Sequence, residues 1–76
     1  MALREARKKA DLFAAQVARR SGVNPNTLLM YERGEKNING AKLLTLLKLC
    51  DVLNCGLQDI ITDPEALELL KKLEIK

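Results

Sequence analysis

Two cysteines, Cys50 and Cys55, are the side chains of this 76-residue chain with the widest range of chemistry. Thiolates bind zinc and form disulfides. Structural zinc sites take four sulfur or imidazole ligands, and the sequence has no third cysteine and no histidine, so we expect no metal site. A disulfide between them is not expected in a reducing cytosol. Cys50 falls on the apolar stripe of a predicted helix, which favours a small buried side chain over a redox role.

The sequence contains no other arrangement that supports catalysis. It lacks a glycine loop that could cradle a phosphate and a nucleophile placed beside a base. We therefore expect neither an enzyme nor a bound cofactor. The charge of the chain is unevenly distributed. Residues up to Lys36 include eight basic and four acidic side chains, whereas the remaining residues include five basic and six acidic ones. A basic half is typical of a surface that meets a polyanion.

The basic half of the chain contains the stretch from Val17 to Gly34. This stretch has the pattern of a helix, a tight turn and a second helix. Gly22 supplies the positive φ that a sharp turn requires. Asn24 is a good N-cap for the second helix, and Pro25 falls at the first helical position, where a missing N–H costs nothing. Gly34 is a typical helix end.

Apolar periodicity predicts further helices around this unit. The expected helices span residues 2–9, 13–20, 24–33, 40–53 and 56–61, and a shorter one follows Asp63. The predicted fold class is all-α, a compact bundle of five helices, or six if the last one forms. We expect residues 1–62 to form one domain and residues 63–76 to pack either on it or in a dimer interface, because so short a helix is marginal alone.

The predicted helix over residues 40–53 is apolar over more than half of its circumference. Its inward stripe is expected to consist of Leu43, Leu46, Leu47, Cys50 and Leu53, with Leu44 and Leu49 off the stripe. The excess suggests that something else covers this helix. No apolar run is long enough to span a membrane, and no signal-peptide pattern follows the basic N-terminus, so we expect a cytoplasmic protein with no membrane partner.

On these residues the sequence resembles the helix-turn-helix of the phage-repressor and Cro family, the xenobiotic-response-element-type regulators of bacteria. The matching motifs are Leu3-Arg4-Glu5 with Arg7, Gly22-Val23, Tyr31-Glu32-Arg33-Gly34 and Thr45-Leu46-Leu47-Lys48-Leu49. They cover roughly Leu3 to Ile61. The resemblance implies a lambda-repressor-like fold that binds double-stranded DNA as a homodimer and regulates transcription.

The resemblance also implies roles for individual residues. The helix from Asn24 to Arg33 would enter the major groove, where Asn26 suits adenine and the apolar Leu29 and Met30 suit thymine methyl groups. Contacts with the DNA backbone would come from Gln16, Thr27, Arg33, Lys36, Asn37 and Lys42, with Asn39 in the same loop. An ion pair between Arg7 and Glu32 would tie the first helix to the third.

Two departures from the family pattern keep a second function open. Phe13 and Ala14 stand where the family has a small polar cap and a glutamine that contacts phosphate, and Asp11 could cap the helix in their stead. Leu29 and Met30 make the reading surface apolar. The alternative is a protein-interaction or antitoxin-like module that uses this surface to bind a protein partner.

Overall fold

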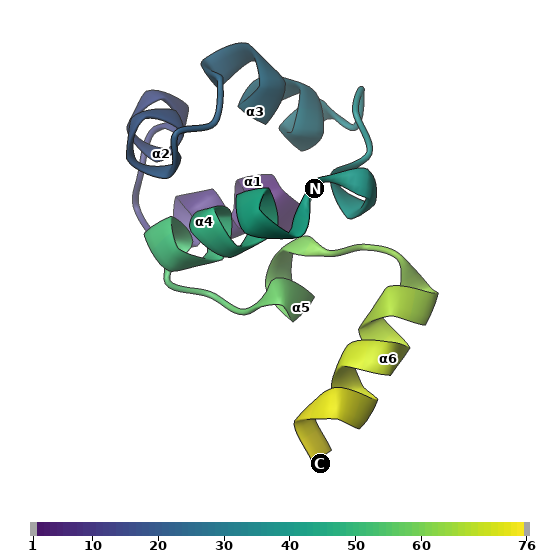
Figure 1. Ribbon diagram of the computed structural model, residues 1–76. Coiled ribbons are helices and arrows are strands. Elements are labelled where there is room, and N and C mark those ends of the chain that lie inside the picture. Colours follow the sequence, from purple (N-terminus) through teal and green to yellow (C-terminus); the bar gives the residue numbers. More distant parts are fainter. Residues whose placement is uncertain (1, 76) are drawn as a thin grey trace.

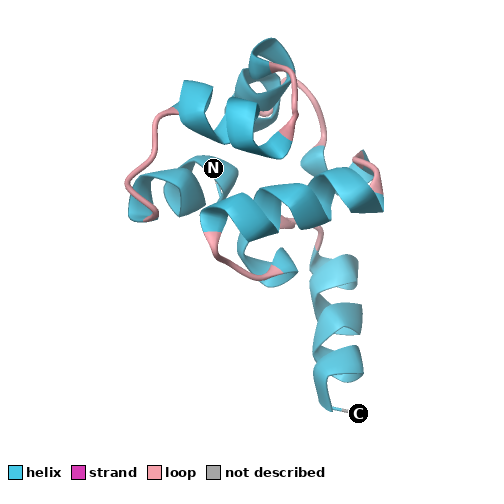
Figure 2. Ribbon diagram, turned by 60° about the vertical axis from the view of Figure 1, so that its left-hand side comes forward, coloured by secondary structure: helices cyan, strands magenta, loops and turns pink. Residues whose placement is uncertain are grey.

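The computed structural model describes residues 2–75, and Figure 1 shows their helices in chain order. These are α1 (Ala2–Lys9), α2 (Ala14–Ser21), α3 (Pro25–Arg33), the one-turn 3-10 helix η1 (Ile38–Gly40), α4 (Leu43–Leu53), α5 (Leu57–Ile60) and α6 (Pro64–Ile75). Figure 2 shows helices and loops without strands over this part of the chain, which confirms the all-α prediction and the sixth helix. The helix expected over residues 40–53 begins only at Leu43, after η1.

The ends of α2 and α3 follow from residues at the ends themselves. Gly22 and Gly34 terminate these helices with φ values of 76° and 78°, a region where a side chain is strained and glycine is not. Asn24 caps α3, because its Oδ1 accepts the N–H groups of Asn26 at 2.8 Å and Thr27 at 3.4 Å. The tight turn between the two helices therefore has a defined start and end.

The expected cap of α2 by Asp11 is wrong. Asp11 lies in the turn after α1 with φ of 58°, a left-handed conformation that Asp tolerates better than most residues. Phe13 occupies the N-cap position, and its N–H donates to Gln16 Oε1 at 2.8 Å. This is half of a capping box, because a phenylalanine side chain has no acceptor to complete the other half.

The core is formed where α2, α3, α4 and α5 meet. Val17, Leu28, Leu49 and Ile60 are fully buried, one from each of these helices, and Leu3 of α1 is nearly so. Burial of a side chain of this size stabilises the folded state by roughly 1.5–3 kcal/mol. The helix-turn-helix is therefore fixed from behind by the rest of the bundle.

The inward face of α4 differs from the predicted stripe. Leu49, expected to lie off it, is fully buried, while Leu43 and Leu47 are 63% and 46% exposed. The buried positions are Leu46, Leu49, Cys50 and Leu53, which keep the spacing of one helical face. Because α4 is apolar over most of its circumference, periodicity alone could not select the face that packs on α2.

Helix α6 leads away from the other helices in both views (Figures 1 and 2). Ala66 and Leu67 pack partly against the core, whereas Leu69 and Leu73 are 50% and 66% exposed. Within residues 2–75 no helix is long and apolar enough to cross a membrane. Residues 1 and 76, the outer ends of the two ranges predicted from the sequence, lie outside the described residues.

The start of α6 is held to η1 by one side chain. Asn39 Oδ1 accepts the N–H groups of Thr62 at 2.9 Å and Asp63 at 3.1 Å, and its Nδ2 donates to Thr62 Oγ1 at 2.9 Å. The amide of Asn39 therefore joins the loop after α3 to the loop before α6. Its side chain is engaged within the protein, in the loop that the resemblance places along the DNA backbone.

Candidate nucleic-acid interface

Helix α3 presents one face to the core and the opposite face to solvent. Leu28 and Tyr31 are buried, and Glu32 is buried beside them. The outward face carries Asn26 and Met30, both exposed, while Leu29 at its flank is half-buried. An exposed helix of this kind, packed on its rear, has the dimensions needed to enter the major groove.

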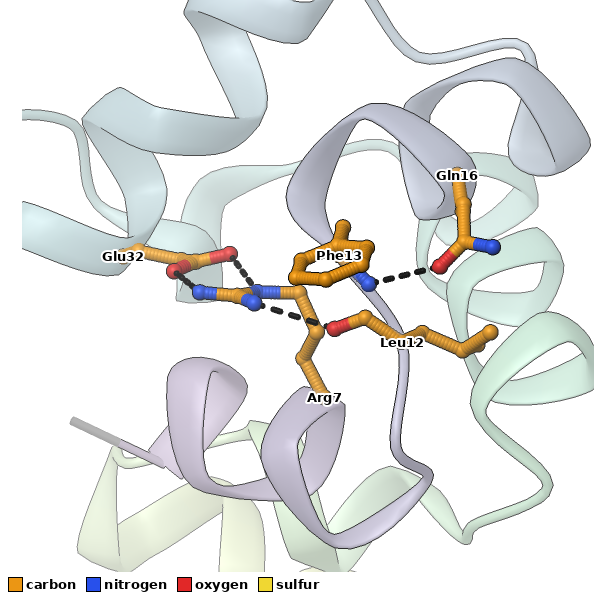
Figure 3. A network of polar contacts seen from close by, with 5 residues as sticks. All are labelled: Arg7, Leu12, Phe13, Gln16 and Glu32. Atoms are coloured by element: carbon orange, nitrogen blue, oxygen red, sulfur yellow. Dashed lines mark hydrogen bonds and ion pairs between the residues drawn. The ribbon is translucent and has the colours of Figure 1, made fainter.

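The rear of α3 is tied to α1 by a bidentate ion pair, drawn in Figure 3. Arg7 Nε donates to Glu32 Oε2 at 2.8 Å, and Arg7 Nη2 donates to Glu32 Oε1 at 2.9 Å. Arg7 Nη1 also donates to the carbonyl of Leu12 at 3.0 Å. The Glu32 side chain is only 4% exposed, and its hydrogen bonds raise the pKa of Arg7, so the guanidinium stays charged and the bidentate pair fixes the orientation of α3.

Cations gather at the C-terminal end of α3. Arg33 is exposed on the last turn, and the N–H groups of Glu35 and Lys36 donate back to the carbonyl of Met30 at 2.9 Å and 3.2 Å. This loop places Lys36 Nζ 5.6 Å from the centre of the Tyr31 ring, a cation–π distance. Two positive charges are thus held next to the outward face of α3.

The other residues expected to touch a DNA backbone lie on separate elements. Gln16 is half-buried in the first turn of α2, and Thr27 is half-buried in the first turn of α3. Asn37 and Lys42 are exposed, before η1 and at the N-cap of α4. The side-chain Oδ1 of Asn37 accepts from Asn39 N at 3.0 Å and from Asn39 Nδ2 at 2.9 Å, and the amide Nδ2 of Asn37 is the side-chain donor that could meet a phosphate.

The helix-turn-helix family model matches residues 3–60, a span that runs from α1 to the end of α5. The chain belongs to this family, the Cro/C1-type helix-turn-helix. Its domain is a DNA-binding domain of this type. No curated protein and no solved structure showed significant similarity to the chain.

In this helix-turn-helix protein an apolar residue, Phe13, occupies the N-cap position of α2. Phe13, at the start of α2, is 77% exposed. Gln16 caps the same helix through Oε1, which orients its amide nitrogen away from Phe13. The sequence signal for this cap was a glutamine three residues after the N-cap position, the spacing of a capping box.

The two cysteines are free and close together, away from α3. Burial, together with the adjacent Cys55, raises the pKa of Cys50 to about 11. Burial also raises the pKa of Cys55. Both thiols are therefore protonated at neutral pH, a form that is a poor nucleophile and a poor metal ligand. No group of three metal-binding side chains occurs in the described part of the chain.

Proposed function

We propose that this chain is a sequence-specific regulator of transcription that binds double-stranded DNA as a homodimer. Membership of the Cro/C1-type family supports DNA binding. The observation that carries the proposal is the orientation of α3. Its buried residues Leu28, Tyr31 and Glu32 pack against the rest of the protein, while its opposite face is exposed to solvent. A rigid helix with an open face is the arrangement with which this type of domain reads the major groove.

The proposal divides the site into two groups of residues. Asn26, Leu29 and Met30 contact base edges and carry the sequence preference. The backbone contacts come from Gln16, Thr27, Arg33, Lys36, Asn37 and Lys42, and they set the register of the domain on the duplex. Arg7 and Glu32 act indirectly, by fixing α3.

The homodimer is proposed to form through leucines that α4 and α6 leave exposed. These are Leu43, Leu44 and Leu47 on α4 and Leu69 and Leu73 on α6. A monomer rarely leaves more than a few hundred Å² of contiguous apolar surface uncovered. Two copies related by a twofold axis would present two α3 helices to successive major grooves, with half-sites roughly 34 Å apart.

The test is selection from a randomised duplex library at two salt concentrations, with sequencing of the retained DNA. We expect an enriched palindromic motif that persists at the higher salt. Lys36→Ala should weaken binding to all sequences and flatten the dependence on salt, because one phosphate contact is lost. Asn26→Ala should instead change the preference among sites.

The matched control is Lys71→Ala, which removes the same charge from an exposed position on α6. It should leave the salt dependence as in the parent chain. Equal losses for Lys36→Ala and Lys71→Ala would mean that Lys36 acts only through net charge. An Asn26→Ala variant that weakens specific and random DNA equally would remove its base-reading role.

A second candidate function rests on the exposure of Phe13 and the apolar side chains of Leu29 and Met30. Such a surface also suits a protein partner, as in an antitoxin-like module. The two functions differ in the same experiment. A protein-binding module would retain no duplex even at low salt, where a DNA-binding domain binds nonspecifically.

A further inference from the structure

The first two turns of α3 carry an unusual set of side chains for a surface that reads bases. Met30 is 38% exposed, and Leu29 is half-buried, yet neither belongs to the buried core. Asn26 is the exposed amide of these turns. The helix therefore brings one polar group and two flexible apolar groups to its outward face.

The major groove contains few groups that an apolar side chain can recognise. Three of the four bases present only donors and acceptors there, and thymine alone adds a methyl group, at C5. A cytosine methylated at C5 carries the same group in the same place. Leu29 and Met30 can bury such a methyl group, whereas they would leave the donors and acceptors of an unmethylated G·C pair without partners.

The charges around this face favour a polyanion as its occupant. Arg33 is exposed on the last turn of α3, and Lys36 lies over the Tyr31 ring beside it. The α2–α3 side of the molecule belongs to the half of the chain in which basic residues outnumber acidic ones by eight to four. Duplex DNA places phosphates on both sides of the groove, where Arg33 and Lys36 can meet them.

We infer that α3 is a reader of methyl groups in the major groove, with Leu29 and Met30 contacting C5-methyl groups next to an adenine bound by Asn26. The inference rests on the proposed DNA-binding function and states which duplexes the site prefers. The site should therefore prefer thymine-rich duplexes. A 5-methylcytosine should substitute for thymine wherever the helix contacts only the methyl group.

The test uses the motif selected from the randomised library, synthesised with each thymine replaced in turn by deoxyuridine. This exchange removes one methyl group and leaves the base pairing, the phosphates and the other major-groove groups unchanged. We expect the Kd, measured by fluorescence anisotropy, to rise about fourfold at each contacted position, the value of one buried methyl group. Methylation of a contacted cytosine should lower the Kd by a similar factor.

Two variants connect the effect to the proposed side chains. Leu29→Ala and Met30→Ala should each abolish the difference between thymine and deoxyuridine at one position of a half-site and leave the other positions sensitive. Both residues lie outside the core, and circular dichroism verifies that the variants fold. Lys71→Ala, on α6, should retain the full difference.

The outcomes separate the inference from the function on which it depends. If the selected motif binds in a salt-dependent manner and deoxyuridine substitution changes nothing, DNA binding stands and methyl reading is wrong. If the effect persists in Leu29→Ala and Met30→Ala, the methyl groups act through DNA shape and the inference also fails. If no duplex binds at low salt, both proposals fail, and the apolar face is left to a protein partner.

Discussion

At the scale of single residues, Glu32 determines how α3 is presented. Its carboxylate is buried to 4% exposure and faces a guanidinium that has no other charged partner among the contacts of the described chain. Arg7 in turn uses its remaining donor on the Leu12 carbonyl, at the end of the turn that follows α1. One ion pair thus links α1, the turn before α2, and the rear of α3.

Replacement of Glu32 by alanine should therefore destabilise the fold. The change leaves Arg7, with a side chain only 14% exposed, without its counter-charge, which costs roughly 3 kcal/mol. Urea denaturation of the two proteins measures the difference, and Glu35→Ala, at an exposed position in the next loop, is the control. A loss as small as that of the control would show that water replaces the carboxylate without cost.

At the scale of elements, the segment from η1 to α6 depends on Asn39. The side chain satisfies two backbone N–H groups and one hydroxyl that lie 23 and 24 residues further along the chain. Thr62 and Asp63 then lead directly into α6, whose second residue donates its N–H to Asp63 Oδ1 at 2.9 Å. The direction in which α6 leaves the bundle follows from this anchor.

Asn39→Ala should release the start of α6 while the helix-turn-helix stays intact. Four side-chain hydrogen bonds are lost, three with Thr62 and Asp63 and one with Asn37 Oδ1, each with a net contribution of about 1 kcal/mol or less. Hydrogen exchange monitored by NMR should show faster exchange for the amides of Thr62, Asp63 and residues 65–67 and no change in α2 and α3. Gln58→Ala, another exposed amide, should leave both regions unchanged, and equal exchange in Asn39→Ala and the parent would remove the anchoring role.

The elements differ in how far the sequence predicts them. The start and end of α3 were predictable, because Asn24, Pro25 and Gly34 act on groups within a few residues. The buried face of α4 was not, because leucines surround most of that helix and its packing partner decides which of them are covered. The anchor at Asn39 joins residues remote in sequence, so no local pattern indicates it. The candidate base-reading residues came from the family resemblance and remain a prediction.

At the scale of the whole molecule, several leucines of α4 and α6 remain exposed to solvent in a single copy of the chain. Leu43, Leu44, Leu69 and Leu73 are each at least 50% exposed, and among the side chains of residues 64–73 it is Ala66 and Leu67 that pack against the core. A helix of 12 residues is marginal in water by itself. A second copy of the chain would cover both helices at once.

Introducing lysine at both Leu69 and Leu73 should therefore convert a dimer to a monomer. Charges at the centre of an apolar interface are costly, whereas the same side chains on a free surface are tolerated. Sedimentation measurements at micromolar concentration should show a dimer for the parent chain and a monomer for the double variant, with the thermal unfolding of α1 to α5 retained. Lys71→Ala together with Lys72→Ala, on the same helix, is the control. A parent chain that sediments as a monomer would contradict the proposed interface.

The weak attachment of α6 has a consequence for the lifetime of the protein. In the proposed dimer the exposed leucines of this helix are covered only when two copies meet, so the stability of α6 depends on protein concentration. A protomer without a partner would expose a less stable, leucine-rich C-terminal helix, and terminal segments with little packing are sites at which proteolysis begins. Surplus single copies would then be degraded faster than paired ones. The pool of regulator would in this way be limited by the same surface that assembles it.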